Sequence, residues 1–393
     1  MALVLIFVLV CVVCVLLYAD GSALHSAESL PSNPPPDTHG AHISIVIPAR
    51  NEAHGISRCL DGALAQTGCS FDVTVIDDAS SDDTPAILAR YAAEHAPRLQ
   101  VVAGRPLLPG WVGKCNACDG GARLTRAFTE QAAGSWLLFL DADTRPGPGL
   151  VIALLAEARR KRLDALSALP FNELGALSER VILPVFFQFI FAAFPLRRMR
   201  NPLMPPDAAL ANGQCVFVRA DVYRAVDGHA AVKDKVLEDV EFAQLLRRSG
   251  YRIGLAQGRA HIAVRMYRSF AEIVEGLGKH ALAGRRRAGA RAFVAVAHLL
   301  AIAVAPTLLL LVGVLWFLLA GDTGVPALGA GVVAFAAAQV YWGGVYASMY
   351  LQPRWLGLLA PVGALVYLLI AARGAGRALA GRGVRWKGRE YAG

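Results

Sequence analysis

Charged residues are scarce in this chain. Only 18% of its 393 residues are Asp, Glu, Lys or Arg, whereas a soluble globular domain usually has about 25%. Hydrophobic residues make up 55% of the sequence, and the mean hydropathy is positive. This balance argues against a chain that is solvated along its whole length, and it predicts that part of the protein lies in lipid.

The sequence also lacks a broad spread of positive charge, although its formal net charge is +9. Arg285, Arg286, Arg287 and Arg291 form one basic cluster, and the residues after Ala372 form a second. These two clusters account for the whole net charge, so the rest of the chain is neutral. Both adjoin apolar runs, which favours anionic lipid headgroups over nucleic acid. We therefore expect no nucleic-acid partner.

Cysteine is sparse and follows no disulfide or zinc pattern. Cys115 and Cys118 form a single CxxC motif, with no second pair and no nearby histidine to complete a zinc site. We expect reduced thiols in a domain that faces the cytosol.

The hydrophobic runs and a polar linker divide the chain. Residues 2–19 contain no charge and are about long enough to cross a bilayer. They lack the basic start of a cleaved signal peptide, so an uncleaved anchor is the preferred interpretation over a signal sequence. The expected units are an anchor (1–20), a Pro- and Ser-rich linker that buries little apolar surface (21–41), a central domain (42–290), a membrane region (291–372) and a basic tail (373–393).

The central domain shows strands alternating with helices. Strands are predicted at 43–47, 73–76, 99–103 and 136–140, and helices at 54–66 and 83–95. This alternation predicts an α/β fold with a mostly parallel sheet whose polar residues gather at the strand ends. The apolar run 181–194 is too short to span a membrane and is either a buried helix or a helix in the membrane interface.

Acidic residues follow two of the predicted strands. Asp141 and Asp143 come directly after the fourth strand, where residues i and i+2 point the same way and can share a Mg²⁺ or Mn²⁺ ion. Such an ion could neutralise a leaving diphosphate. Asp77 and Asp78 end the second strand; they suit either helix capping or hydrogen bonds to a nucleobase and ribose.

Three further motifs could contribute to a site. Glu238-Asp239 precedes an amphipathic helix and offers either ordinary helix-dipole stabilisation or a general base for an acceptor hydroxyl. Lys114 lies on a predicted Gly-rich loop, where it is either solvated or in contact with phosphate. Asn212-Gly213-Gln214 is read as a tight turn first and as an acceptor-side loop second.

Taken together, these segments resemble the family 2 glycosyltransferases, which have the GT-A nucleotide-sugar-binding fold. The resemblance covers about residues 43–270 and rests on pieces in family order: Ile45–Glu52, Val75–Thr84, Lys114, Asp141–Asp143 and Glu238–Asp239. The single anchor, the Arg265-Met266-Tyr267 stretch and the closing Trp386–Tyr391 segment resemble membrane enzymes that act on carotenoid, hopanoid or ceramide-like lipids.

The resemblance implies a role for each matched residue. Asp77 or Asp78, Glu52, Lys114 and Asp141 would bind the nucleotide-sugar donor, expected to be UDP-linked. Asp143, with Asp141, would hold the Mg²⁺ or Mn²⁺ ion. Asp239 would be the base of an inverting displacement, with Glu238 and the 212–214 turn on the acceptor side. Processive members carry a Gln-x-x-Arg-Trp motif, but this chain has no tryptophan beside Arg265-Met266, which favours transfer of one sugar.

Two other functions are considered. An enzyme of the same fold could charge polyprenyl phosphate with a sugar, and it would need no strong base because its acceptor is a phosphate. A channel or transporter subunit would need polar residues inside its spans. Few are present beyond His298 and Gln339, so transport is disfavoured.

The predicted membrane topology contains a conflict. The basic cluster before residue 292 favours a multi-pass protein of the cell membrane whose catalytic domain faces the cytoplasm. If the apolar runs 292–320, 325–349 and 355–372 all crossed, the basic tail would lie on the opposite side, against the positive-inside rule. We therefore expect 355–372, which contains Pro361, to be re-entrant or interfacial.

Overall fold

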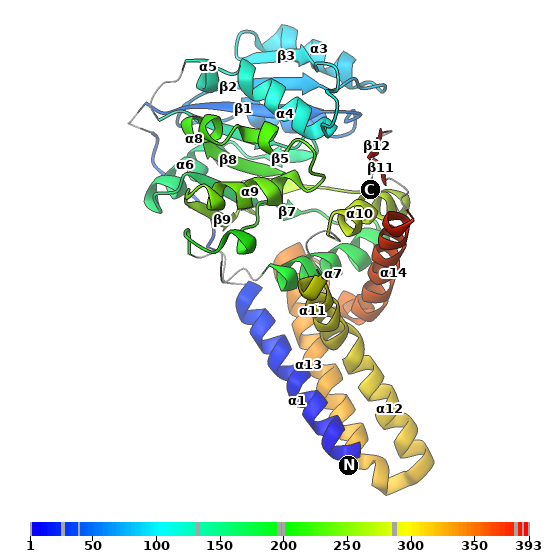
Figure 1. Cartoon of the computed structure of the whole chain (residues 1–393). Coiled ribbons are helices and arrows are strands. Elements are labelled where there is room, and N and C mark those ends of the chain that lie inside the picture. The colour runs from blue at the N-terminus through cyan, green and yellow to red at the C-terminus, as the bar shows by residue number, and fades with distance from the viewer. Residues whose placement is uncertain are drawn as a thin grey trace.

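The computed structural model describes residues 2–24, 28–37, 40–130, 134–194, 198, 201–284, 289–380, 384–386 and 389–391. Arg285, Arg286, Arg287 and Lys387, which the sequence assigned to the two basic clusters, lie outside these residues. A broad α/β domain stands at one end, and a long bundle of helices extends away from it (Figure 1).

A seven-stranded sheet forms the centre of the catalytic domain, in the order β3-β2-β1-β4-β8-β6-β9. Every neighbouring pair is parallel except those that involve β8, which runs against β4 and β6. The strands are β1 (His42–Ala49), β2 (Ser70–Asp77), β3 (Leu99–Ala103), β4 (Trp136–Leu140), β6 (Ala165–Leu169), β8 (Cys215–Arg219) and β9 (Ile253–Gln257). The predicted α/β fold is confirmed.

Helices cover both faces of this sheet, because successive strand residues point to opposite sides. In β1, Ile43, Ile45 and Ile47 belong to one apolar cluster, whereas Val46 belongs to the other. The first cluster packs under α2 (Ile56–Leu64), α3 (Thr84–His95) and α6 (Leu150–Arg160). The second packs under α4 (Gly113–Leu124), α5 (Arg126–Thr129), α8 (Ala220–Ala225) and α9 (Glu238–Arg248).

A second, three-stranded sheet lies beside the first. Its order is β5-β10-β7, with β5 (Thr144–Pro146), β7 (Phe171–Asn172) and β10 (Ile262–Val264). β5 follows the Asp141–Asp143 segment directly, and β10 leads into Arg265-Met266-Tyr267. The small sheet therefore connects two segments that contribute to one site.

The linker is more closely attached to the domain than its composition predicted. Leu30 is buried in the apolar core, and its backbone N–H donates to the carbonyl of Gln257 at 2.9 Å. Asp37 forms an ion pair with Arg159 at 2.5 Å. The prediction that this linker buries little apolar surface was wrong for Leu30, because residues 28–30 pair with the end of β9.

The remaining helices form the elongated part of the molecule. α1 (Ala2–Leu24), α12 (Ala305–Ala320) and α13 (Val325–Tyr350) run side by side in the far bundle (Figure 1). Nearer the catalytic domain are α7 (Leu177–Ala193), α10 (Phe270–Gly284), α11 (Gly289–Leu299) and α14 (Ala360–Leu379), with the short hairpin of β11 (Val384–Trp386) and β12 (Arg389–Tyr391) beside α10.

Two helical stretches are long and apolar enough to cross a membrane. They are Arg291–Tyr350, which turns back at the 3-10 segment Gly321–Gly324, and Arg354–Arg377. A shorter apolar helix covers Val4–Ala19. By length and composition, these segments favour association with a membrane.

Candidate active site

A cavity of about 210 Å³ opens at the edge of the sheet where β1, β2 and β4 end. Pro48 and Ala49 come from the end of β1, Asp78 follows β2, and Asp141 follows β4. Because β8 runs antiparallel to β4, the turn that precedes it also reaches this edge. The topology thus gathers segments far apart in sequence around one space, as expected for an open α/β sheet.

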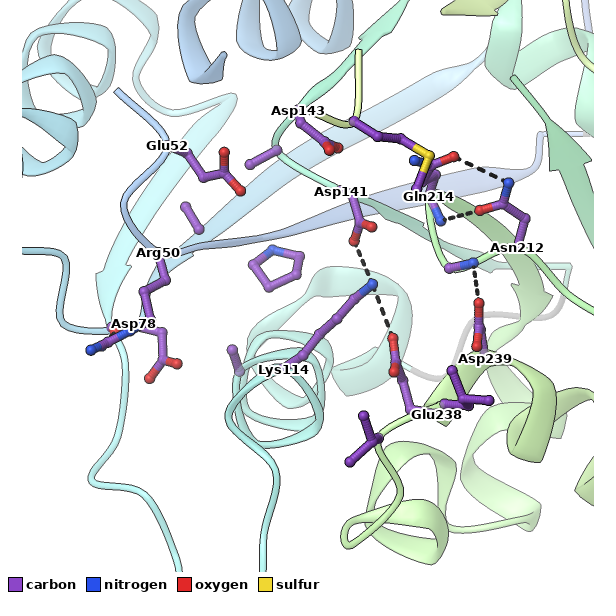
Figure 2. A pocket seen from close by; sticks show the side chains of 18 of the residues that line it. Arg50, Glu52, Asp78, Lys114, Asp141, Asp143, Asn212, Gln214, Glu238 and Asp239 are labelled. Carbon is purple, nitrogen blue, oxygen red and sulfur yellow. Dashed lines mark hydrogen bonds and ion pairs between the residues drawn. The ribbon is translucent and has the colours of Figure 1, made fainter. Parts of the chain in front are cut away.

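Lys114 is the central cation of this cavity. Its Nζ lies 2.6 Å from Asp141 Oδ1 and 3.0 Å from Glu238 Oε1, so it bridges the end of β4 and the start of α9 (Figure 2). Removal from bulk water alone would lower the pKa of Lys114, but the charges of Asp141 and Glu238 raise it well above its ordinary value. The ammonium therefore stays charged and can stabilise a further anion.

Lys114 belongs to the first turn of α4, so its prediction as a loop residue was wrong. Gly120 and Gly121 lower the helix propensity of this segment, yet Gly121 is required by packing. A Cβ on Gly121 would fall 2.7 Å from Val46 Cγ1 and 2.9 Å from Ile76 Cγ1. The glycine therefore lets α4 lie close on β1 and β2.

Asp239 is fixed by two backbone donors. Gly213 N–H donates to its Oδ2 at 2.8 Å (Figure 2), and Val240 N–H donates to its Oδ1 at 2.8 Å. Burial raises the pKa of Asp239 to about 6, with a further increase from the Glu238 charge that Lys114 partly offsets. Glu238 and Asp239 are the first residues of α9 rather than a segment before it, so the helix N-terminus fixes their direction. A carboxyl group with a pKa near neutrality is suited to accept a proton.

The turn at residues 212–214 is confirmed. Cys215 N–H donates to the Asn212 carbonyl at 3.1 Å, and the side chains of Asn212 and Gln214 bond to each other at 3.1 Å. A Cβ on Gly213 would fall 2.9 Å from Lys114 Nζ and 3.2 Å from Asp239 Oδ2. All three turn residues line the cavity, and glycine at 213 leaves room for the lysine and the acid.

Most of the acidic residues that the sequence assigned to donor or metal binding line the cavity, but one does not. Glu52, Asp78, Asp141 and Asp143 all line the cavity. Asp77 is absent from the residues that form this lining in the described chain, and its carboxylate accepts a hydrogen bond from Ser80 N–H at 3.1 Å. The structure thus brings Asp78, rather than its neighbour, into the space that a ligand could fill.

Sequence motifs missed part of the cavity wall. Arg50 lines it and donates to the carbonyl oxygens of Asp78 and Ala79, which ties the ends of β1 and β2 together. Met266 and Tyr267 line it from the other side. All three residues lie in motifs that the sequence contains, Ile45–Glu52 and Arg265–Tyr267, but neither motif by itself indicated that these side chains line a cavity.

An ion pair anchors the segment that carries Met266 and Tyr267. Arg265 donates to the fully buried carboxylate of Glu179 in α7 at 3.1 and 2.9 Å, and backbone N–H groups of Gly175 and Ala176 donate to the same carboxylate. Tyr267 packs in an apolar cluster with residues of α7, α10 and α13. One wall of the cavity is therefore built on the helices that adjoin the elongated bundle.

The protein itself supplies few metal ligands. Within the described residues, no group of three or more His, Cys, Asp or Glu side chains is arranged to hold a metal ion. Cys115 and Cys118 are buried in α4. Asp141 and Asp143 nevertheless line the same cavity, and Mg²⁺ is commonly bound by one or two carboxylates together with substrate phosphates. The two carboxylates fit such an ion.

The chain is similar in sequence to known glycosyltransferases. Residues 44–226 match the sequence profile of Glycosyl transferase family 2. The chain is 28% identical over 301 residues to the succinoglycan biosynthesis protein ExoO of Rhizobium meliloti (strain 1021), covering 64% of this chain and 82% of ExoO. It is 34% identical to chondroitin synthase of Escherichia coli over 118 residues, which span 30% of this chain but only 15% of that enzyme.

A solved structure resembles almost the whole chain. The mannosyltransferase PcManGT from Pyrobaculum calidifontis, in complex with GDP-Man and Mn²⁺, aligns with a TM-score of 0.50 and 17% identity, covering 94% of this chain and 98% of its own. At this identity the likeness concerns the fold. Together with the matched profile, it confirms the family and fold predicted from the sequence: residues 44–226 form a family 2 glycosyltransferase domain, and this chain is a glycosyltransferase with the GT-A fold.

Proposed function

We propose that the protein transfers one sugar from a nucleotide-sugar to a hydroxyl group of a membrane lipid, with inversion at the sugar carbon. The observation that carries this proposal is the position of Asp239. It lies in one cavity with Lys114, Asp141 and Asp143, and that cavity is bounded by Tyr267, whose apolar cluster includes residues of the helices near the bundle. Carotenoid-, hopanoid- or ceramide-like lipids are the proposed acceptors.

The donor is proposed to lie between the ends of β1, β2 and β4. Asp78 and Glu52 would contact the nucleobase and ribose, and Lys114 would face the diphosphate. PcManGT is in complex with a nucleotide-sugar, which supports a donor of this chemical class. UDP-sugars are the first to be tested.

Asp141 and Asp143 are the proposed ligands of a Mg²⁺ or Mn²⁺ ion. When bound, the ion would supply positive charge beside the donor diphosphate. The residues of the chain then have separate tasks. Lys114 stabilises the negative charge that develops on the leaving diphosphate. Asp239 takes the proton of the acceptor hydroxyl as that oxygen attacks the sugar carbon.

The arrangement of the helices supports a proposed membrane topology. In Figure 1, α1, α12 and α13 extend away from the catalytic domain, whereas α14 stays beside α7 and α10. We propose that the first three helices cross the membrane, that α7 and α14 lie near its surface, and that the catalytic domain faces the cytoplasm. With only two crossings after the catalytic domain, the basic tail returns to the cytoplasmic side and the positive-inside rule is met.

A cysteine introduced after Tyr391, in a variant whose exposed Cys11 is replaced by serine, tests this topology. Labelling by an impermeant thiol reagent only after cell lysis is the expected result. Labelling of intact cells would show that α14 crosses the membrane.

The chemical proposal is tested with membrane extracts, a panel of radiolabelled nucleotide-sugars, and mass spectrometry of the labelled lipid. A sugar joined through a glycosidic bond to the oxygen of a lipid hydroxyl is expected. A sugar linked to polyprenyl phosphate would favour the alternative enzyme, and in that case Asp239→Asn should retain most of its turnover because a phosphate acceptor needs no strong base.

A further inference from the structure

A second, much smaller cavity lies behind the active-site acids. Its volume is about 10 Å³, which is roughly the space that one water molecule needs. Lys114, Asp141, Glu238 and Asp239 line both cavities, so the two spaces adjoin at these side chains. Cys118 and His229 line only the small one. His229 comes from the 3-10 segment Gly228–Val232.

The ring of His229 is held in one orientation. It stacks on Phe242, with ring centroids 5.4 Å apart and planes 10° apart, and it meets Phe139 edge-on at 4.6 Å. Its Nδ1 lies 2.9 Å from the Tyr223 hydroxyl, and its backbone N–H donates to the same oxygen at 3.1 Å. Gly228 makes this approach possible, because a Cβ there would fall 2.1 Å from Tyr223 Cζ.

These contacts determine which nitrogen of His229 carries the proton. Burial, together with the nearby Lys114 charge, lowers the pKa of His229 to about 3, so the ring is neutral. Burial raises the pKa of Tyr223 well above its ordinary value, so its hydroxyl keeps its hydrogen. Within the described part of the chain, the recorded partners of that hydroxyl are Nδ1 and the His229 backbone N–H, and the latter is itself a donor, so we assign the hydrogen to the bond with Nδ1. Nδ1 is therefore unprotonated, and the proton is on Nε2.

Nε2–H makes no hydrogen bond to any side chain or backbone group that the structure describes, although His229 is only 6% exposed. A buried donor usually has a partner, and the ring borders the water-sized cavity. The groups around Asp239 are Glu238 on its own helix, Lys114 and Cys118 on α4, Asp141 after β4, and His229. Within this set, His229 has a neutral ring. Its bond to Tyr223 fixes the ring so that Nε2–H is the free donor.

We propose that His229 is a positioning residue for the reaction: its Nε2–H donates, through one water molecule in the small cavity, to the carboxylate of Asp239. Such a donor favours the ionised carboxylate and limits its rotation. This inference rests on the proposed role of Asp239 as the base. It adds a support on the side of Asp239 that faces away from the substrate.

The pH profile of turnover tests the proposal. His229→Phe keeps the stacking on Phe242 but removes the donor, so the acidic limb should move up by about one pKa unit, the scale of a lost hydrogen bond to a charged group. Turnover near pH 6 should fall by about fivefold, because the ionised fraction of Asp239 drops when its pKa rises by about one unit, and it should recover at pH 8.5. A purely structural defect would lower turnover by the same factor at every pH.

Two amide variants provide a matched pair. The Gln amide reaches the position of Nε2 and can donate, whereas the Asn amide is shorter and reaches only the position of Nδ1. His229→Gln should therefore restore the parental profile, and His229→Asn should behave like His229→Phe. Tyr223→Phe releases the constraint on the tautomer and should give a smaller shift in the same direction, which tests the proposal even if a His229 variant fails to fold.

The outcomes separate this proposal from the one it rests on. If Asp239→Asn keeps its turnover, the assignment of the base is wrong. If Asp239→Asn is inactive while the His229→Phe and Tyr223→Phe profiles superimpose on that of the parent, His229 has no role in supporting the base. Equal profiles for His229→Gln and His229→Asn would also overturn the proposal.

Discussion

Apolar side chains are buried in the catalytic domain, whereas many side chains of the same types are exposed on the surface of the extended bundle. In the domain, the isoleucines of β1 are completely buried beneath helices. In the bundle, Leu318 of α12 is 72% exposed and Val340 of α13 is 78% exposed. Small residues occupy the contact between α12 and α13 instead, where a Cβ on Gly313 or Gly331 would approach the facing backbone within 2.7 Å.

This difference shows that apolar composition does not by itself identify a core. In the domain, removal of apolar side chains from water stabilises the fold. Where α12 meets α13, side chains such as Leu318 and Val340 point outward and the helices touch through small residues such as Gly313 and Gly331, as in helices surrounded by lipid. The polar chemistry is confined to the sheet edge between these regions. The following predictions test the contrast from the largest expected effect to the smallest.

Removal of divalent metal ions should abolish turnover, because the proposed carboxylate ligands Asp141 and Asp143 lie in the active-site cavity. Addition of Mg²⁺ or Mn²⁺ should restore it. Turnover is measured on protein treated with a chelator, before and after the ion is returned. Full activity of the metal-free enzyme would show that the active site needs no metal ion at Asp141 and Asp143.

Asp239→Asn should lower turnover by about 10²-fold or more, the usual scale for loss of a positioned base. Asn keeps the size of the side chain, so donor binding should change little. Donor affinity and single-turnover rates distinguish the two effects. Near-normal turnover would show that Asp239 is not the base. Glu238→Gln would then be the next variant to measure.

Leu311→Glu and Leu124→Glu compare an exposed leucine in each region. Leu311 of α12 is 58% exposed and Leu124 of α4 is 47% exposed. If lipid surrounds α12, the first variant should weaken insertion by about 3 kcal/mol, whereas the second should change stability by about 0.5 kcal/mol or less. The fraction of protein that resists alkaline extraction from membranes measures this. If the two variants resist alkaline extraction to the same extent, the proposal that lipid surrounds α12 is wrong.

Gly331→Val and Gly329→Val compare two glycines of α13 that are two residues apart. A Cβ at 331 would fall 2.6 Å from the Leu309 carbonyl oxygen, whereas a Cβ at 329 meets no atom within 4 Å. The first variant should lose about 1–3 kcal/mol of stability through overpacking, and the second should be nearly neutral. Thermal unfolding in detergent reports the difference. Both variants should bind the nucleotide-sugar donor normally if the two regions act independently.

The framework of the catalytic domain could be predicted from the sequence because its strands are continuous apolar runs. The predicted strands at 99–103 and 136–140 agree with β3 and β4 to the residue. Long apolar runs also marked the helical segments of the C-terminal region. Each of these elements is specified by local hydrophobicity, which a single sequence contains in full.

Other features depend on contacts between distant segments. α4 was hidden because Gly120 and Gly121 lower its helix propensity, and only the closeness of β1 and β2 explains them. The choice between Asp77 and Asp78 depends on how the chain turns after β2. His229 carried no signal at all, since its importance comes from Tyr223 on α8 and from the cavity under Asp239.

The packing of α1 against α13 also constrains the order in which the molecule is built. Val10, Val13 and Leu17 of α1 are buried among residues from the C-terminal helices, yet α13 ends only at Tyr350. From residue 24 to residue 350, a ribosome adding about 5–20 residues per second needs roughly 15–65 s. During that interval α1 exists without its final neighbour, while the whole catalytic domain emerges and has time to fold. The bundle therefore closes last, and a truncation between β9 and α13 would leave a complete sheet joined to an α1 helix that lacks α13, the helix it contacts most.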